Sequence, residues 1–406
     1  MQIVDLATWM DNYSSKGWYW YVKRLSGNDT LLNQAHQAGP YIPGQVADEL
    51  TPSVMRSTAL NPRKWFRVSI DSHLLEENVS AIWYNNKIVR DGTRDECRIT
   101  NWGGSSSPIL DPDSTGSIFI LAFHKAGNQD ADEVRVWLCT DLEQEDLVEN
   151  RIGPVEPGAR IFIVHSSPGV LPQISYDRSQ KPTTCLLSPA EIPPAWLHTF
   201  PSAIEIAQKA ISLRPARGRS ADDRLMQRKS CEYDVFRSVE EQHVLPRIRQ
   251  GFSSVEEFLE LASSIANRRK SRAGKSLEFQ TRAVFDEEHV RYSHGEVSEL
   301  NKKPDFLFPS AEVYHNSAKG VKNLYMLAVK TTCKDRWRQI LNEADKIPVK
   351  HLLTVQEGIS ENQFREMQAA GVVLVVPRSL HSQYIPAIKS QLLTLEDFIA
   401  MLRDSQ

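Results

Sequence analysis

The chain has 406 residues, 41% hydrophobic and 24% charged, a composition typical of a soluble globular protein with room for two domains. Its net charge of -3 excludes a protein that coats nucleic acid through overall positive charge, so any DNA binding must come from local patches. The first residues lack a basic segment followed by an apolar one, and no apolar run approaches membrane-spanning length. We therefore expect a cytoplasmic protein.

The five cysteines, at positions 97, 139, 185, 231 and 333, are widely scattered. They form no Cys-x-x-Cys pair and have no histidine partners at zinc-ligand spacing. We expect all five to be reduced thiols.

Short runs of aromatic and β-branched residues, separated by turn residues, dominate the first part of the chain. The clearest predicted strands are 18–22, 81–84, 117–121 and 134–138. In the first of these, Trp18 and Trp20 alternate with two tyrosines, and we expect the tryptophans to lie in the core. Residues 1–170 are predicted to form a mostly β domain, either a barrel or a sandwich.

Prolines crowd the next segment, which favours an extended connector, and we place a linker at residues 171–195. From 196 to 406, helical patterns and apolar runs alternate, which predicts an α/β domain. The expected helices are 255–261, 276–290 and 361–370, and the expected strands include 351–355 and 372–376.

Two other apolar runs of this second domain carry charged residues at their ends. Pro304-Asp305 opens one run, and Lys330 closes the next, 324–329. On adjacent strands, these residues would place a carboxylate and an ammonium side by side at one sheet edge, as in a magnesium nuclease. A single Pro-Asp pair is more often only a turn.

The second acid of such a site usually stands two positions before the lysine, where this chain has Ala328. Glu343 is the natural substitute. It lies within a predicted helix over 335–344, whose apolar stripe is made of Trp337, Ile340, Leu341 and Ala344.

Longer stretches resemble the EcoRII family of restriction endonucleases. The resemblance is carried by residues 267–278, 301–310 and 327–347 in the second half, and by 23–26, 28–30, 36–37, 41–43 and 98–100 in the first. It implies two domains: an N-terminal, mostly β pseudobarrel that binds effector DNA, similar to that of plant auxin-response factors, and a C-terminal α/β nuclease domain of the PD-(D/E)xK type with a central mixed sheet.

The same resemblance implies an activity and partners. The family members are homodimeric type IIE enzymes that require two double-stranded DNA sites, CCWGG with W being A or T, and cut before the first cytosine. A cognate cytosine methyltransferase is then expected in the host.

The resemblance also assigns roles to acidic and basic groups. Asp305 and Glu343 would bind Mg2+, and Lys330 would position the attacking water and the phosphate. Glu278 would complete the acidic edge from a helix that also carries Val284. Carboxylates without His or Cys partners suit magnesium, although an exposed glutamate is most often only a solvated surface residue.

Two clusters are candidates for DNA contact in this domain. Lys334, Asp335 and Arg336 offer two donors and one carboxylate that match the edges of G·C pairs, or they form an ordinary charged helix start. Arg268, Arg269 and Arg272 belong to a basic cluster that contacts phosphates or is a solvated loop; we favour contact.

In the first domain, two polar loops resemble the arms that grip effector DNA. The first arm would include Lys23 and His36, with Asn33 and Gln37 beside them, and the second arm would include Arg94, Glu96 and Arg98. Gly92 and Cys97 stand where the related enzyme has lysines, so we expect a weaker affinity or a weaker salt dependence at this site. The alternative is that His36 is an ordinary loop histidine and that the arginines belong to a solvated turn without a role in DNA binding.

Two classes of function compete. The first is a magnesium-dependent, sequence-specific phosphodiesterase with a second, regulatory DNA site. The alternative is a non-catalytic, bivalent DNA-binding regulator, but such a descendant would be expected to have lost Asp305, Lys330 or Glu343. A general repair nuclease fits poorly because it has no use for base-reading groups in both halves.

Overall fold

The protein is described by a computed structural model that covers residues 5–33, 38–165, 173–177, 185–319, 321–334 and 336–405. The chain divides into two compact units. Unit 1 contains residues 1–179 together with two later segments, 356–364 and 383–388, and unit 2 contains the remainder.

Unit 1 is built on one nine-stranded sheet in the order β2-β5-β4-β3-β7-β6-β1-β8-β9. Neighbouring strands are antiparallel except β3 and β7, which are parallel. The strands are β1 (Trp18–Arg24), β2 (Tyr41–Ile42), β3 (Arg63–Ile70), β4 (Leu75–Tyr84), β5 (Glu96–Thr100), β6 (Ile118–His124), β7 (Glu133–Leu138), β8 (Arg160–Val164) and β9 (Gln173–Asp177). The α-helices are α1 (Leu6–Asn12), α2 (Gly44–Leu50), α3 (Pro52–Met55), α4 (Asn86–Val89) and α5 (Leu142–Ile152).

The neighbouring strands β1 and β6 are buried on both faces of the sheet, and their successive side chains point to opposite sides. In β1, Trp20 and Val22 pack into a cluster with α1 and α5, while Tyr21 packs into a second cluster with α2. Trp18 and Trp20 are both buried, as expected. The four predicted strands are confirmed as β1, β4, β6 and β7.

The sheet curls on itself. β1 and β2 stand six places apart in the strand order, which would separate them by roughly 29 Å in a flat sheet at about 4.8 Å per strand. Yet the Tyr21 hydroxyl on β1 donates a 3.1 Å hydrogen bond to the Tyr41 carbonyl on β2, and the Arg160 guanidinium at the start of β8 lies 4.2 Å from the Tyr41 ring centre. This closure makes unit 1 a pseudobarrel.

The range 171–195, expected to be a linker, contains regular structure at both ends. β9 pairs with β8 as an outer strand of the unit 1 sheet, and a short helix, α6 (Pro194–His198), begins at the other end. Residues 178–184 lie outside the described part of the chain.

Unit 2 combines long helices with a five-stranded mixed sheet in the order β10-β11-β12-β13-β14. β11 is antiparallel to both of its neighbours, β10 and β12, whereas β12, β13 and β14 run parallel, which confirms the expected mixed α/β domain. The strands are β10 (Ser293–His294), β11 (Phe306–Phe308), β12 (Tyr325–Val329), β13 (Lys350–Leu353) and β14 (Val372–Val375). The α-helices are α6, α7 (Ala203–Leu213), α8 (Ala221–Gln250), α9 (Val255–Glu287), α10 (Ala311–Asn316), α11 (Glu361–Ala369), α12 (Pro386–Lys389) and α13 (Leu395–Ser405), of which α11 and α12 lie partly in unit 1.

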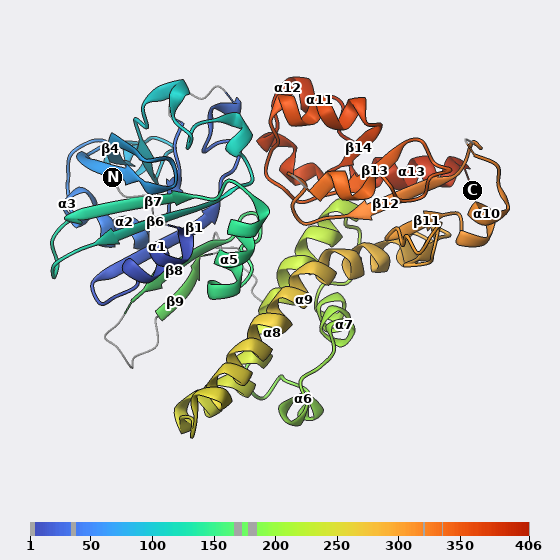
Figure 1. The fold of residues 1–406 in the computed structure, drawn as a ribbon, viewed down its shortest axis with the longest axis horizontal. Coiled ribbons are helices and arrows are strands. Elements are labelled where there is room, and N and C mark those ends of the chain that lie inside the picture. Colours follow the sequence, from blue (N-terminus) through green and yellow to red (C-terminus); the bar gives the residue numbers. More distant parts are fainter. Residues whose placement is uncertain are drawn as a thin grey trace. The chain divides into compact units, whose positions relative to one another are not determined.

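The helix α9 is one continuous element, where the sequence suggested two separate helices. Ser254 caps its N-terminus by accepting a hydrogen bond from the Glu257 amide, and α8 runs alongside it (Figure 1). Its C-terminal part is apolar on one side, and Phe285 packs edge-on against Phe306 and Phe308 of β11. This aromatic contact fixes the strand that follows Asp305.

The cysteine prediction is wrong for two residues. Cys185 and Cys231 form a disulfide that joins the segment before α6 to α8, with Cα atoms 5.0 Å apart. Cys97, Cys139 and Cys333 are buried thiols outside this disulfide. Over the described residues, no helix has both the length and the apolar character needed to cross a membrane.

Candidate active site

Asp305 and Lys330 meet at one edge of the unit 2 sheet. Asp305 directly precedes β11 and Lys330 directly follows β12, and these strands are antiparallel neighbours with Phe306 opposite Leu327. The Asp305 Oδ2 atom accepts a 2.7 Å hydrogen bond from the Val329 amide and lies 3.9 Å from the Lys330 Nζ atom. The predicted pairing of carboxylate and ammonium is therefore present in the structure.

Glu343 joins this pair from a turn. The predicted helix over 335–344 is wrong: the described part is a short 3₁₀ helix, η5 (Arg336–Ile340), followed by turns. Burial raises the pKa of the Glu343 carboxyl to about 7, the negative charge of Asp305 adds to the rise, and the ammonium groups of Lys330 and Lys350 oppose it. The three predicted residues thus share one electrostatic environment.

The arrangement has the features of a magnesium site. The Glu343 Oε2 atom is buried and has no hydrogen-bond partner among the described residues, an arrangement that costs free energy unless a ligand satisfies it. Mg2+ is commonly held by one or two carboxylates together with waters and substrate phosphates, so Asp305 and Glu343 fit it. The described residues contain no group of three or more acidic, histidine or cysteine side chains that would enclose a metal by themselves.

Glu278 is held by a histidine. It lies on α9, and its carboxylate bonds to the His294 Nε2 atom on β10. His294 pairs with Phe306 in the sheet, and the next residue, Gly295, donates its amide to the Asp305 carbonyl at 3.0 Å. The helix and the Asp305 strand are therefore connected through β10.

The structure describes two of the three residues expected to read bases. Lys334 and Arg336 are both partly exposed and flank the start of η5, whereas Asp335 lies outside the described residues. The Trp337 amide bonds to the Cys333 carbonyl at 3.1 Å, which ties this segment to the end of β12.

The basic cluster is part of α9 and not a loop. Arg269 pairs with Glu240 on α8 at 2.6 Å, and the Arg268 guanidinium lies 3.9 Å from the centre of the Phe200 ring. Arg272 is 3% exposed and lies 4.7 Å from the centre of the Tyr233 ring. In this conformation Arg269 and Arg272 contact α8 and Arg268 contacts the segment between α6 and α7, and their predicted phosphate contacts remain predictions.

Some residues of the predicted effector arms line a pocket of about 370 Å³ in unit 1. Its lining includes Lys23, Glu96 and Arg98. Lys23 is buried and pairs with Asp29 at 2.5 Å, while Arg94 pairs with Glu96 and stacks on the Tyr84 ring. His36 and Gln37 lie outside the described residues, and Asn33 bonds to Asn28 beside the pocket.

The same pocket receives two later segments of unit 1. Glu357 and Gln383 line it, the Gly27 amide bonds to the Glu357 carbonyl at 2.8 Å, and the Asn28 side chain bonds to Gln383 at 2.8 Å. Burial raises the pKa of the Glu357 carboxyl although Lys23 lies near. An acidic side chain thus lies in the pocket wall beside Lys23, Glu96 and Arg98, three of the residues predicted to bind DNA.

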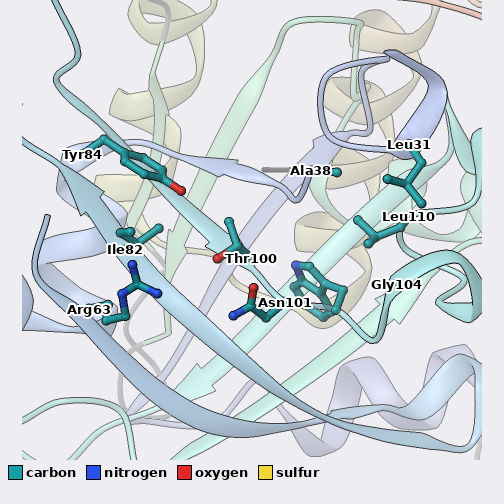
Figure 2. Close-up of a pocket in the computed structure, with 10 residues that line it drawn as sticks. Leu31, Ala38, Arg63, Ile82, Tyr84, Thr100, Asn101, Gly104 and Leu110 are labelled. Atoms are coloured by element: carbon teal, nitrogen blue, oxygen red, sulfur yellow. The ribbon is translucent and has the colours of Figure 1, made fainter. Parts of the chain in front are cut away.

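A second cavity of unit 1, about 380 Å³ in volume, lies elsewhere on the sheet. Figure 2 shows Tyr84, Ile82 and Thr100 along its wall, with Arg63 and Asn101 beside them. None of the predicted site residues within the described chain lines this cavity.

Three residues near the site were missed by sequence reasoning. Lys350 begins β13 next to an apolar run, the same kind of signal that pointed to Asp305 and Lys330, whereas His294 ends β10 and has no apolar run beside it. Ala344 adopts a left-handed φ of 48°, which the sequence does not indicate because alanine disfavours it.

Comparisons with known proteins agree with this architecture. The family description "Restriction endonuclease EcoRII, N-terminal" matches residues 14–166, and "EcoRII C terminal" matches residues 236–399. Similar solved structures include metal-depleted Ecl18kI in complex with uncleaved, modified DNA (TM-score 0.44, 17% identity, 51% of this chain and 78% of that chain) and a PspGI–substrate DNA complex (TM-score 0.42, 18% identity, 54% and 98%).

One relative extends over nearly the whole chain. The type II restriction enzyme EcoRII of Escherichia coli is 45% identical over 401 residues, which cover 97% of this chain and 96% of that enzyme. Both family descriptions and this full-length match agree, and the chain belongs to the EcoRII family of type II restriction enzymes.

Proposed function

We propose that this protein is a magnesium-dependent type II restriction endonuclease that hydrolyses double-stranded DNA at CCWGG. The convergence of Asp305, Lys330 and Glu343 at one sheet edge carries the proposal. Packing does not require two carboxylates and an ammonium at such an edge, whereas phosphodiester hydrolysis uses all three.

Each residue has a distinct task in this proposal. Asp305 and Glu343 would hold Mg2+, which when bound acidifies a water and stabilises charge on the phosphate. The Lys330 ammonium, close to Asp305, would bind a phosphate oxygen and stabilise the negative charge that develops there. Glu278, oriented by His294, would complete the acidic edge from α9.

Recognition would begin next to the catalytic lysine. Lys334, Asp335 and Arg336 would read the G·C pairs, because lysine and arginine donors suit guanine and a carboxylate suits the cytosine amino group. η5 begins at Arg336 and leads toward Glu343, so a shift of the segment on a wrong sequence would also displace the proposed metal ligand.

A second DNA copy would act through unit 1. Lys23, His36, Arg94, Glu96 and Arg98 would bind it, and DNA entering their pocket would compete with Glu357 and Gln383. Such competition would relieve autoinhibition, in which unit 1 keeps the nuclease domain inactive until the second DNA copy binds. We further propose a cytoplasmic homodimer whose host protects its own sites with a cytosine methyltransferase.

Plasmid cleavage tests the activity. The intact protein with Mg2+ should convert a plasmid with several CCWGG sites into defined fragments, and Asp305→Ala should bind the same DNA without cutting it. If both proteins bind the DNA but neither cuts it, the proposal is contradicted. That result would favour the alternative function, a non-catalytic DNA-binding regulator.

The two-site requirement needs a separate assay. A plasmid with one CCWGG site should be cut slowly, and a short duplex carrying the same site should accelerate cleavage when added in trans. A duplex of scrambled sequence is the matched control. Equal rates with and without the cognate duplex would rule out the effector role of unit 1.

A further inference from the structure

The Glu343 carboxylate is not held by its own side-chain contacts. Its Oε2 atom has no partner within the described residues, so its position depends on the backbone of the turn. On the N-terminal side, the Glu343 amide donates a 3.0 Å hydrogen bond to the Ile340 carbonyl of η5. The other side of the turn requires a different anchor.

A buried lysine provides that anchor. The Lys350 ammonium donates hydrogen bonds to the carbonyls of Glu343 and Ala344, the latter at 2.6 Å. Lys350 is only 5% exposed, and burial lowers the pKa of its ammonium. A buried charge is costly unless its bonds are satisfied, so its two carbonyl partners are specific contacts and not incidental ones.

The turn is shaped to make both bonds. In an extended strand, the carbonyls of two successive residues point to opposite sides. The carbonyls of Glu343 and Ala344 can both reach the Lys350 ammonium because the chain turns sharply between them. Ala344 supplies this turn with its φ of 48°, a conformation that is unfavourable for a residue with a Cβ. Its amide lies 3.4 Å from the Ser298 hydroxyl, a further contact on the same turn.

Lys350 also belongs to the sheet that carries the rest of the site. It is the first residue of β13, and its amide donates a 2.9 Å hydrogen bond to the Gly371 carbonyl. β13 pairs in parallel with β12, and the Lys330 amide bonds to the Leu353 carbonyl at 2.9 Å. One residue thus connects the Glu343 turn to the strand pair that carries Lys330.

We propose that Lys350 is a positioning residue that fixes the Glu343 turn and thereby places the Glu343 carboxylate beside Asp305 for metal binding. The inference rests on the proposed function, because it takes Glu343 as a ligand. Lys350 itself touches neither substrate nor metal.

The test compares Lys350→Met with Lys346→Met in the full-length protein. The Lys346 ammonium bonds to the carbonyls of Tyr314, His315 and Ser317 at 3.1, 2.8 and 2.9 Å, so this control also removes lysine-to-carbonyl bonds beside the same turn. Mn2+ titration followed by electron paramagnetic resonance measures metal affinity without cleavage. Lys350→Met should weaken Mn2+ binding about 10- to 100-fold, whereas Lys346→Met should leave it unchanged.

Two further variants separate positioning from general stability. Lys350→Arg retains a charged donor and should recover much of the Mn2+ affinity. In a Glu343→Gln background, Lys350→Met should cause no additional loss, because both changes act on the same carboxylate. Circular dichroism spectra and melting temperatures verify that each variant is folded.

The outcomes are distinguishable. Wild-type Mn2+ affinity in folded Lys350→Met would overturn the inference, as would an equal loss in Lys346→Met. A Glu343→Gln variant that binds Mn2+ as the wild type does would instead refute the proposed role of Glu343, and this inference with it.

Discussion

The Asp305 carboxylate accepts a hydrogen bond from the backbone amide of Val329, the residue that directly precedes Lys330. A bond from β12 itself therefore orients the proposed metal ligand. The distance between the carboxylate and the lysine ammonium, 3.9 Å, is fixed by the pairing of two strands and not by flexible side chains alone.

Asp305→Asn is expected to abolish cleavage while preserving the fold. The amide oxygen of asparagine can still accept the Val329 bond, but the loss of charge removes a metal ligand, and we expect kcat/KM to fall about 10³-fold or more. Single-turnover cleavage measures the loss, and a melting curve checks stability. Cleavage near the wild-type rate would show that Asp305 is not a ligand.

Metal binding should release protons at mildly acidic pH. The pKa of Glu343 is raised to about 7 by burial and by Asp305, so Mg2+ must displace a proton below that pH. Affinity should rise with pH up to about 7 and then level off. Calorimetry in two buffers with different ionisation enthalpies measures the proton count, and Glu343→Gln should remove the pH dependence.

The same carboxyl should affect the stability of the metal-free protein. Its pKa is higher in the folded state than its ordinary value of 4.5, so the folded state binds the proton more tightly. This contribution to stability is complete below about pH 4.5 and is lost as the pH rises through about 7. Urea unfolding of wild type and Glu343→Gln across this range should show the difference; parallel curves would contradict it.

Phe285→Ala should destabilise unit 2 by about 3–5 kcal/mol, because the ring packs against both Phe306 and Phe308 and its removal leaves a cavity under β11. Phe285→Leu fills most of that space and should cost less. Denaturant unfolding followed by circular dichroism measures both variants. A loss below about 1 kcal/mol for the alanine variant would mean that the core collapses around the site.

The disulfide should make unit 2 sensitive to reductant. Cys185 and Cys231 are 46 positions apart, and opening a loop of this size typically costs about 2–4 kcal/mol. Reduction of the purified protein should lower its melting temperature, and a variant with serine at both positions should not respond. Because cytoplasmic thiols are kept reduced, a proposed cytoplasmic enzyme would work in the less stable form. Identical melting with and without reductant would argue against the bond.

Arg98→Ala should weaken effector binding. The guanidinium of Arg98 bonds to the carbonyls of Asn28 and Gly39, which precede and follow His36 in the sequence, and we expect the loss to be about 1–3 kcal/mol. Stimulation of one-site plasmid cleavage by added duplex measures it. Arg67→Ala is the matched control, since it removes the same charge from an exposed position on β3. Equal effects of the two variants would mean that Arg98 contributes only its positive charge and makes no specific contact with the effector DNA.

The sequence predicted the parts of the site that depend on strand pattern. Asp305 and Lys330 stand at the ends of apolar runs, and a run of that length forms a strand whose ends carry the polar residues to a sheet edge. The strands of unit 1 were predictable for the same reason. The acidic residue at position 343 was also identified, although its surroundings were not.

The missed features depend on tertiary contacts. The spacing of Trp337, Ile340 and Ala344 fits an α-helix, but two side chains from outside this segment, Ser298 and Lys350, bond to Ala344 in the turn that follows η5. Likewise, α9 continues through its basic stretch, where the ion pair between Arg269 and Glu240 of α8 stabilises the helix. The disulfide could not be predicted because the sequence does not show that the segments of Cys185 and Cys231 lie side by side.

The displacement of the second acid also changes what position 328 does. Ala328 is fully buried and pairs with Leu352 in β13, so the strand position that usually carries a charged ligand is a packing position in this protein. A glutamate introduced there would need to enter the core before it reached the sheet edge. With Glu343 as the proposed second carboxylate, a pattern search that demands an acid two positions before the lysine will miss this chain.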